Sequence, residues 1–219
     1  MLKRLPALLA ALLFLVLPVS QFALEPANLN SAKWAVQQYA ASGEYGRDLA
    51  AVALQANKYI NKRVTRARPD QKLAIVFDID ETVLTNLSEM QENDYGYVPA
   101  VWNRWLAESR APAIVPVQAV YETAVRHKVA VFFITARHEN QRASTEKNLR
   151  QVGYDTWQKA YFMADDTEKP ARLYKTAIRV QIESEGYTII ANVGDQASDL
   201  QGGHAEKTFK LPNPFYIVK

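Results

Sequence analysis

Short runs of consecutive apolar residues alternate with longer amphipathic stretches over the last two thirds of the chain. Each run is brief and partly β-branched, which is typical of a strand that is buried on both faces of a parallel sheet. The runs that we assign to strands are 73–77, 129–134, 161–164 and 188–193. The stretches that we assign to helices between them are 116–127, 140–152 and 174–185. This alternation predicts an α/β fold with a doubly wound, three-layer parallel sheet.

Two regions lie outside this alternation. Residues 24–70 carry apolar side chains at helical intervals, with a break at Ser42-Gly43, and we assign them to a helical lead-in. Residues 87–116 follow the first strand and contain several aromatic side chains, among them Tyr95 and Trp102. We therefore expect a core domain over 71–219 that is interrupted by a small, mostly helical insertion at about 87–116.

The start of the chain differs from the rest. Lys3 and Arg4 precede an apolar run at 5–19 that has no charged residue, which is the layout of a secretory signal peptide. We predict this signal over 1–23 and expect the protein to be exported, either to the periplasm or as a secreted protein. The run is short for a membrane span, which needs about 20 residues, although an uncleaved anchor is an alternative.

The charge of the chain changes once this segment is set aside. The 219 residues carry a formal net charge of +3, from 26 Lys and Arg and 23 Asp and Glu, and removal of the signal leaves 24 basic residues against 23 acidic ones. Near neutrality gives no electrostatic case for a nucleic-acid polymer as a partner. We also expect no stable membrane association after signal removal, and leave a homo-oligomer open.

The absence of cysteine limits the chemistry that is available. It excludes disulfides, zinc-thiolate sites, iron–sulfur clusters and thiol nucleophiles. The three histidines do not have the spacing of metal ligands. Catalysis or binding would therefore depend on carboxylates, hydroxyls, amines or a bound ion that prefers oxygen ligands.

Residues that can supply such chemistry follow three of the predicted strands. In chain order they are Asp78 and Asp80, then Thr135 and Arg137, then Asp195 and Asp199. The carboxyl ends of parallel strands meet at one edge of a sheet, where ligands bind, and Lys175 in the intervening helix adds an amine. Four converging carboxylates would repel one another, and a divalent cation with oxygen ligands, for which we expect Mg²⁺, would relieve this repulsion. For a single aspartate after a strand, a helix cap is the alternative.

The segment Asp78-Ile79-Asp80-Glu81-Thr82-Val83-Leu84-Thr85-Asn86 resembles the first motif of the haloacid dehalogenase (HAD) superfamily. Its Asp-x-Asp-Glu-Thr form is similar to the class B and class C acid phosphatase branch, subfamily IIIB, which includes plant vegetative storage proteins and bacterial outer-membrane acid phosphatases. The resemblance continues through Thr135, Lys175, Gly194-Asp195-Gln196-x-x-Asp199 and the closing segment 209–214. It covers about 73–218.

The resemblance implies a role for each matching residue. Asp78 would be the nucleophile that forms an aspartyl-phosphate, and Asp80 the general acid and base. The metal would be held by Asp78, the backbone carbonyl of Asp80 and Asp195, with Asp199 supporting the site without binding the ion. Phosphoryl oxygens would be held by Thr135 and Lys175. For the amine, Lys169 is the competing candidate.

The insertion after Asn86 stands where members of the superfamily have their cap, the element that selects which phosphate esters reach the active site. A small cap implies an open cleft. Tyr95 and Trp102 could stack on a nucleobase, or pack the insertion onto the core, and Arg137 could bind phosphate or form a surface ion pair.

The resemblance therefore implies an exported, Mg²⁺-dependent acid phosphatase. The expected substrates are small phosphomonoesters, with nucleoside monophosphates as one candidate class. Transfer of the phosphoryl group to acceptor alcohols is a third possibility that uses the same intermediate. The alternative function is that of a non-catalytic storage protein or a phosphate-ligand-binding protein on the same fold.

Overall fold

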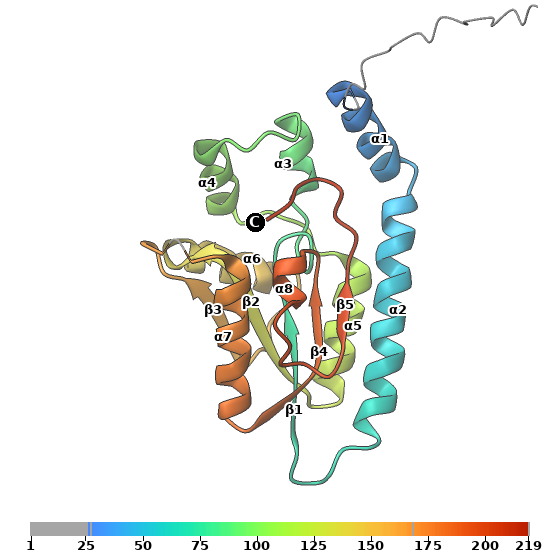
Figure 1. Cartoon of the computed structure of the whole chain (residues 1–219), viewed down its shortest axis with the longest axis vertical. Helices are drawn as coiled ribbons and strands as arrows, with labels where there is room; N and C mark the ends of the chain where they lie inside the picture. Colours follow the sequence, from blue (N-terminus) through green and yellow to red (C-terminus); the bar gives the residue numbers. More distant parts are fainter. Residues whose placement is uncertain (1–25, 27, 168, 219) are drawn as a thin grey trace, which may run out of the picture.

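The computed structural model describes residue 26, residues 28–167 and residues 169–218 (Figure 1). The signal peptide that we predict over 1–23 lies outside these residues. Within the described part of the chain, no helix combines the length and the apolar composition that a bilayer span requires.

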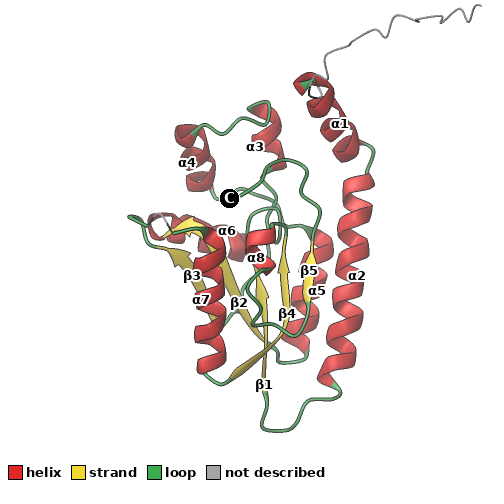
Figure 2. Cartoon of the chain, viewed as in Figure 1, coloured by secondary structure: helices red, strands yellow, loops and turns green. Residues whose placement is uncertain are grey.

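A five-stranded parallel sheet forms the centre of the molecule (Figure 2). Its strands are β1 (Lys72–Phe77), β2 (Ala130–His138), β3 (Lys159–Met163), β4 (Tyr187–Gly194) and β5 (Thr208–Lys210). They are arranged in the order β3-β2-β1-β4-β5, and every neighbouring pair is parallel. The central strand β1 buries five consecutive residues, Leu73 to Phe77, as its unbroken apolar run predicted.

Helices cover both faces of this sheet. Side chains that alternate along β1 divide between two hydrophobic clusters, with Ile75 and Phe77 in one and Ala74 and Val76 in the other. The first cluster is completed by α2 (Glu44–Val64) and α5 (Val115–Arg126), and the second by Ile182 of α7 (Ala171–Ser184). This three-layer arrangement confirms the predicted doubly wound α/β fold.

The strands of the sheet depart most clearly from the sequence-based prediction in two places. Strand β2 does not end at residue 134 but continues to His138, with an irregular register against β3 between Ile134 and His138. Strand β5 was not predicted, because its three residues bury only Phe209 and give no apolar run. Beyond β2, a 3₁₀ turn at Glu139–Gln141 leads into α6 (Arg142–Gln151).

Two helices precede the sheet. The first, α1 (Leu29–Ala41), has no buried residue, whereas α2 buries Leu49, Ala53, Ala56 and Ile60. The break between them falls at Ser42-Gly43, as predicted, where Gly43 has a φ of 77°. Glycine adopts this left-handed conformation without the steric cost that other residues incur.

Three short helices stand at the carboxyl ends of the strands (Figure 1). The insertion after β1 contains α3 (Leu87–Glu92) and α4 (Pro99–Glu108), and α8 (Ala197–Leu200) follows β4. The C-terminal segment runs back beneath α3 and α4, so that it lies between this insertion and the sheet (Figure 1). The space between these elements is where the predicted site residues should meet.

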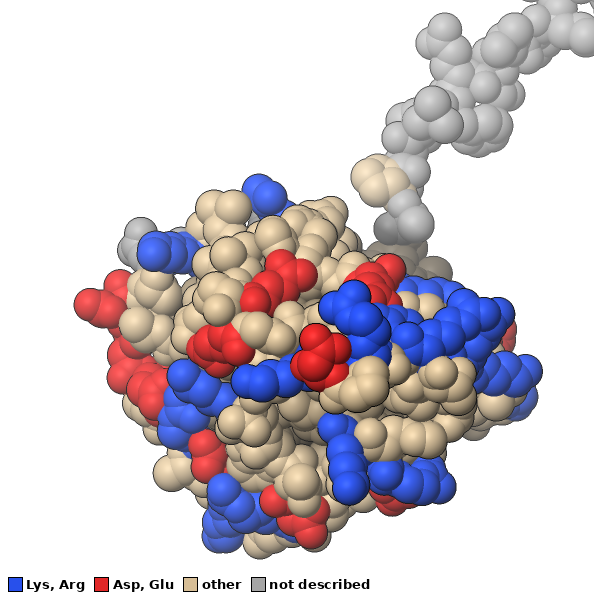
Figure 3. Space-filling model, turned by 90° about the horizontal axis from the view of Figure 1, so that it is seen from below, with Lys and Arg blue, Asp and Glu red and all other residues tan. Residues whose placement is uncertain are grey.

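The opposite end of the molecule has a mixed surface. Basic and acidic side chains lie next to one another on the face that is seen from below (Figure 3). One ion pair, between Arg63 Nε of α2 and Glu206 Oε2 at 2.7 Å, ties α2 to the segment before β5.

Candidate active site

Three aspartates form a buried cluster at the carboxyl edge of the sheet. Asp78 follows β1, Asp195 follows β4, and Asp199 lies in α8. One carboxylate oxygen of each lies within 4.8 Å of the others, and all three residues are buried. The fold therefore brings together carboxylates that are up to 121 positions apart in the sequence.

Lysine 175 supplies the positive charge of this cluster. It projects from α7, and its Nζ donates hydrogen bonds to Asp78 Oδ1 at 2.5 Å and to Asp199 Oδ1 at 2.6 Å. Burial alone would lower the pKa of Lys175, but the two carboxylates raise it above its ordinary value. The competing Lys169 is exposed and does not line the cavity described below. Geometry thus places Lys175, not Lys169, at the carboxylates.

Asp195 has no cationic partner among the described residues. Its carboxylate accepts hydrogen bonds from three neutral donors, Thr82 Oγ1 at 3.1 Å, Gln196 Nε2 at 2.6 Å and Asn213 Nδ2 at 2.7 Å. Burial, followed by the charge of Asp199, raises its pKa. The three aspartates therefore carry more negative charge than Lys175 neutralises.

This donor set fits a hard divalent cation. Buried carboxylate oxygens with incomplete charge compensation are the ligands that such cations prefer in proteins, and hydrogen bonds hold both Asp78 and Asp195 in place. Burial raises the pKa of Asp78 well above its ordinary value, while Lys175 acts in the opposite direction. Asp199 accepts from Lys175 and, through Oδ2, from the backbone N–H of Gln196 at 2.7 Å.

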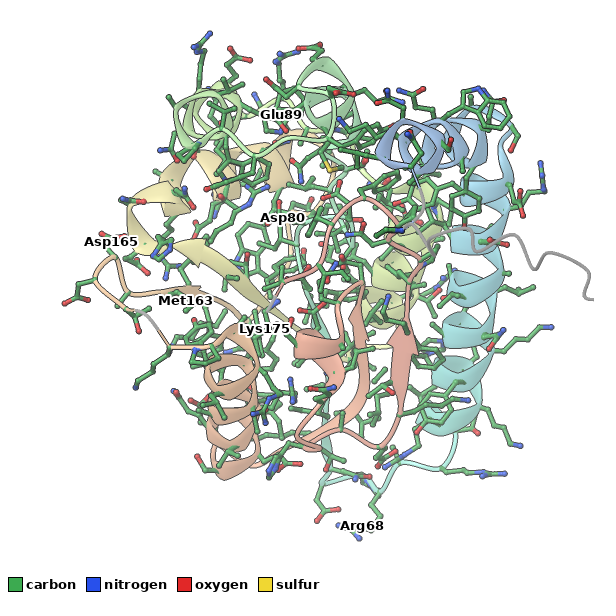
Figure 4. All side chains as sticks on the ribbon, turned by 45° about the horizontal axis from the view of Figure 1, so that its top comes forward. Arg68, Asp80, Glu89, Met163, Asp165 and Lys175 are labelled. Atoms are coloured by element: carbon green, nitrogen blue, oxygen red, sulfur yellow. The ribbon has the colours of Figure 1, made fainter. Side chains whose placement is uncertain are left out.

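Asp80, which is labelled in Figure 4 together with Lys175, does not pair with that lysine but with Arg137. Arg137 Nη2 donates to Asp80 Oδ1 at 2.6 Å, and Arg137 Nε lies 3.2 and 3.1 Å from Oδ1 and Oδ2. Burial would raise the pKa of Asp80, but the guanidinium outweighs it and the pKa is lowered. Arg137 is itself buried, at 4% exposure, so the ion pair, which was one of the two alternatives for this residue, is internal and not at the surface, while phosphate binding by Arg137 stays a prediction.

Thr135 lies within β2 and is fully buried. Its Oγ1 accepts a hydrogen bond from the backbone N–H of Arg137 at 3.0 Å, and it does not line the cavity. Its predicted contact with phosphoryl oxygens stays a prediction.

Four residues that were not predicted to belong to the site, Glu81, Asn86, Asn213 and Tyr216, form hydrogen bonds around its charged groups. Glu81 is fully buried, with a φ of 50°, and accepts from the backbone N–H of Asn86 at 2.5 Å and from Tyr216 Oη at 3.0 Å. Burial and the charge of Asp80 raise the pKa of Glu81 to about 8. Asn86 also contacts Asp80, and Asn213 contacts Asp195. Glu81 and Asn86 stand in the Asp-x-Asp-Glu-Thr segment and Asn213 in the closing segment, which was the only available signal.

A cavity of about 450 Å³ opens next to these groups. Asp78, Asp80, Lys175, Asp195 and Asp199 line it on the side of the sheet. The lining residues that come from the insertion and the chain end are largely apolar or aromatic, among them Tyr95, Trp102 and the tail 215–218, and polar side chains of the segment 137–141 also line the cavity. The cavity is therefore polar where the carboxylates lie and apolar towards the cap.

Tyr95 and Trp102 of the insertion are compatible both with packing onto the core and with substrate contact. Tyr95 stacks on Phe215, with ring centroids 6.1 Å apart and planes at 9°, and Trp102 lies 5.9 Å from the guanidinium of Arg137. Each packs against the main hydrophobic cluster and also lines the cavity. Substrate contact by these rings stays a prediction.

Comparison with known proteins shows the family and the fold of the chain. A model of the HAD superfamily, subfamily IIIB (acid phosphatase), matches residues 10–219. The chain is 34% identical over 192 residues to the stem 28 kDa glycoprotein of Glycine max, which covers 84% of this chain and 74% of the relative. It is 31% identical over 188 residues to acid phosphatase 1 of Solanum lycopersicum, which covers 84% and 73%. The solved class C acid phosphatase from Bacillus anthracis has the same fold, with a TM-score of 0.70 at 24% identity over 86% of each chain.

Proposed function

The chain belongs to subfamily IIIB of the HAD superfamily, the acid phosphatases, and is a phosphomonoester hydrolase; from this premise we propose that it is an exported, Mg²⁺-dependent enzyme acting on small phosphomonoesters. The observation that carries the proposal is the buried cluster of Asp78, Asp195 and Asp199 around Lys175. Its uncompensated negative charge and its oxygen ligands favour a divalent metal.

The reaction proceeds in two displacements. A carboxylate oxygen of Asp78 attacks phosphorus, the bond from phosphorus to the leaving oxygen breaks, and an aspartyl-phosphate forms. Asp80 donates a proton to the leaving oxygen and then accepts one from the water that releases inorganic phosphate. Because its ammonium already contacts Asp78, Lys175 is placed to hold phosphoryl oxygens and to neutralise the charge that develops on them.

Mg²⁺ would be held by Asp78, the backbone carbonyl of Asp80 and Asp195, and when bound it would supply positive charge to the phosphoryl group. Asp199 would support this site through Lys175. The three amide and hydroxyl donors on Asp195 fix the orientation of its carboxylate, which is how residues around a metal ligand strengthen binding.

The cavity indicates the size of the substrate. A volume of about 450 Å³ suits a small soluble ester. Tyr95 and Trp102 line its apolar side, and we propose nucleoside monophosphates as candidate substrates because these rings could stack on a base. Export is proposed from the basic and apolar pattern of residues 1–23.

Hydrolysis of p-nitrophenyl phosphate, with Mg²⁺ and with a chelator, tests the proposal. We expect turnover with Mg²⁺, its loss with chelator, and no activity above background for Asp78→Asn. Asp70→Asn, at an exposed position near the opposite end of β1, is the matched control and should keep full activity. Full activity of Asp78→Asn would overturn the assignment. Absence of turnover across a panel of phosphate esters at several pH values would favour the storage or binding function instead.

A further inference from the structure

A chain of hydrogen bonds links the insertion to Asp80. We propose that Asn86 is a positioning residue for the catalytic acid, and that Trp105 of α4 holds Asn86 in its working orientation. The inference rests on the proposed function, because it takes Asp80 to be the group that protonates the leaving oxygen.

The side-chain amide of Asn86 is fully buried and has a partner at each end. Its Oδ1 accepts a hydrogen bond from Trp105 Nε1 at 2.8 Å. Its Nδ2 donates to Asp80 Oδ1 at 2.8 Å and to Glu81 Oε2 at 3.1 Å. An indole N–H is only a donor, so it can pair with the amide oxygen and not with the amide nitrogen. Trp105 therefore determines that the amide N–H groups face the two carboxylates.

The bonds to Asp80 are distributed unequally between its two oxygens. Oδ1 accepts from Asn86 Nδ2, from Arg137 Nη2 at 2.6 Å and from Arg137 Nε at 3.2 Å, whereas Oδ2 accepts, among the described residues, only from Arg137 Nε at 3.1 Å. Asn86 thus helps to fix the rotation of the Asp80 carboxylate, with Oδ1 held by two residues and Oδ2 left as the oxygen with fewer partners.

Trp105 is itself held firmly. It is 5% exposed, and the guanidinium of Arg110 lies over its ring at 4.4 Å from the centroid. Because Trp105 belongs to α4, the position of this helix and the orientation of the Asp80 carboxylate are linked through one buried amide. An insertion that moved away from the sheet would leave Asn86 free to rotate and the acid misoriented.

The dependence of the rate on the leaving group separates this role from a merely structural one. An alkyl oxygen needs a proton as it departs, but p-nitrophenolate leaves without one, so only the alkyl ester depends on a well-placed acid. We expect Asn86→Ala to lower kcat/KM for propyl phosphate at least about tenfold more than for p-nitrophenyl phosphate. Trp105→Phe keeps an aromatic ring and removes one donor, and should give an extra loss for the alkyl ester of about fivefold, the factor for one ordinary hydrogen bond.

The double variant tests the order of the chain. If Trp105 acts through Asn86, Asn86→Ala combined with Trp105→Phe should show the same leaving-group dependence as Asn86→Ala alone. Trp157→Phe is the matched control, because Trp157 packs against Phe133 away from the cavity and should leave both rates unchanged. Thermal unfolding of each variant shows that it is folded.

The outcomes distinguish the inference from the proposed function. One outcome is that Asp80→Ala lowers kcat/KM more for propyl phosphate than for p-nitrophenyl phosphate, while the Asn86 and Trp105 variants lower it equally for both esters. In that case the positioning role is wrong and the proposed function stands. If Asp80→Ala itself affects both esters equally, the acid role in the proposed function is wrong. Fully additive losses in the double variant would overturn the link through Trp105.

Discussion

Replacement of Lys175 with methionine should destabilise the protein and abolish most of its activity. Methionine is unbranched and apolar, so it can follow the path of the lysine stem without a clash, but it removes the ammonium that contacts Asp78 at 2.5 Å and Asp199 at 2.6 Å. Lys175 is 3% exposed, so water cannot replace those bonds. Removal of one partner from a buried ion pair costs about 3–5 kcal/mol of unfolding free energy, and we expect a loss in this range when a chelator is present.

The loss of activity has a separate cause. The ammonium would neutralise charge that develops on the phosphoryl oxygens during transfer, and removal of one such group lowers kcat by about 100- to 1,000-fold in comparable sites. Because a divalent cation adds positive charge to the same cluster, Mg²⁺ should recover part of the lost stability of Lys175→Met but little of its activity.

Lys169→Met is the matched control, because Lys169 is exposed and does not line the cavity. Urea unfolding of both variants measures the stability change, and hydrolysis of p-nitrophenyl phosphate measures the activity. The role of the Lys175 ammonium would be refuted if Lys175→Met kept activity within a few-fold of the unchanged protein. It would also be refuted if Lys169→Met lost as much activity and stability as Lys175→Met.

Three further changes test other contacts of the site. Gly194→Ala would place a Cβ 2.5 Å from Asp199 Cβ, so we expect lost activity and a lower melting temperature. Gly46→Ala, which lies in α2 and meets no atom within 4 Å, should keep full activity and should not lower the melting temperature, because alanine favours a helix more than glycine does. Normal activity of Gly194→Ala would contradict the close contact. Asn213→Ala removes a hydrogen-bond donor that orients the Asp195 carboxylate. The Mg²⁺ concentration for half-maximal activity should therefore rise about 10- to 100-fold, and an unchanged concentration would contradict this role. The pKa of Glu81 is raised from 4.5 to about 8, so folding takes up a proton, and the stability that this gives is fully present below pH 4.5 and is lost as the pH rises through about 8. We therefore compare how the unfolding free energy of the unchanged protein and of Glu81→Gln falls with pH between pH 5 and 8, in the presence of chelator. The slope should be smaller for Glu81→Gln, by up to about 1.4 kcal/mol per pH unit. Equal slopes would show that Glu81 does not titrate in this way.

The fold was largely predictable because four strands are buried on both faces. Such strands appear in the sequence as short apolar runs, of which Leu73 to Phe77 is the clearest. Prediction failed where burial is partial. Strand β2 continues to His138 through Thr135, Ala136 and Arg137, which form no apolar run, and β5 buries Phe209 alone. In both places the hydrogen bonds of a neighbouring strand, which no local pattern records, determine the strand.

The site was predictable only to the extent that its residues follow strands or stand in motifs. Asp78, Asp195 and Asp199 meet because the topology brings the ends of β1 and β4 together. The contacts that orient these groups could not be predicted, since they join distant positions through packing. Tyr216 bonds to Glu81 across 135 positions, and Trp105 bonds to Asn86 only because α4 lies above the sheet.

The charges in the site suggest that Asp80 has a different role from the other three aspartates. Asp80 is matched by its own cation, Arg137, which lowers its pKa, and it is therefore not part of the excess negative charge. The ammonium of Lys175 pairs with Asp78 and Asp199 but not with Asp195, and burial raises the pKa of Asp78 and Asp195. A cation that entered this cavity would gain most from the second group, and would lower the pKa values of its carboxylates to keep Asp78 ionised for attack. Because the two groups contact different residues, metal binding and acid catalysis would depend on different neighbours of the same strand end.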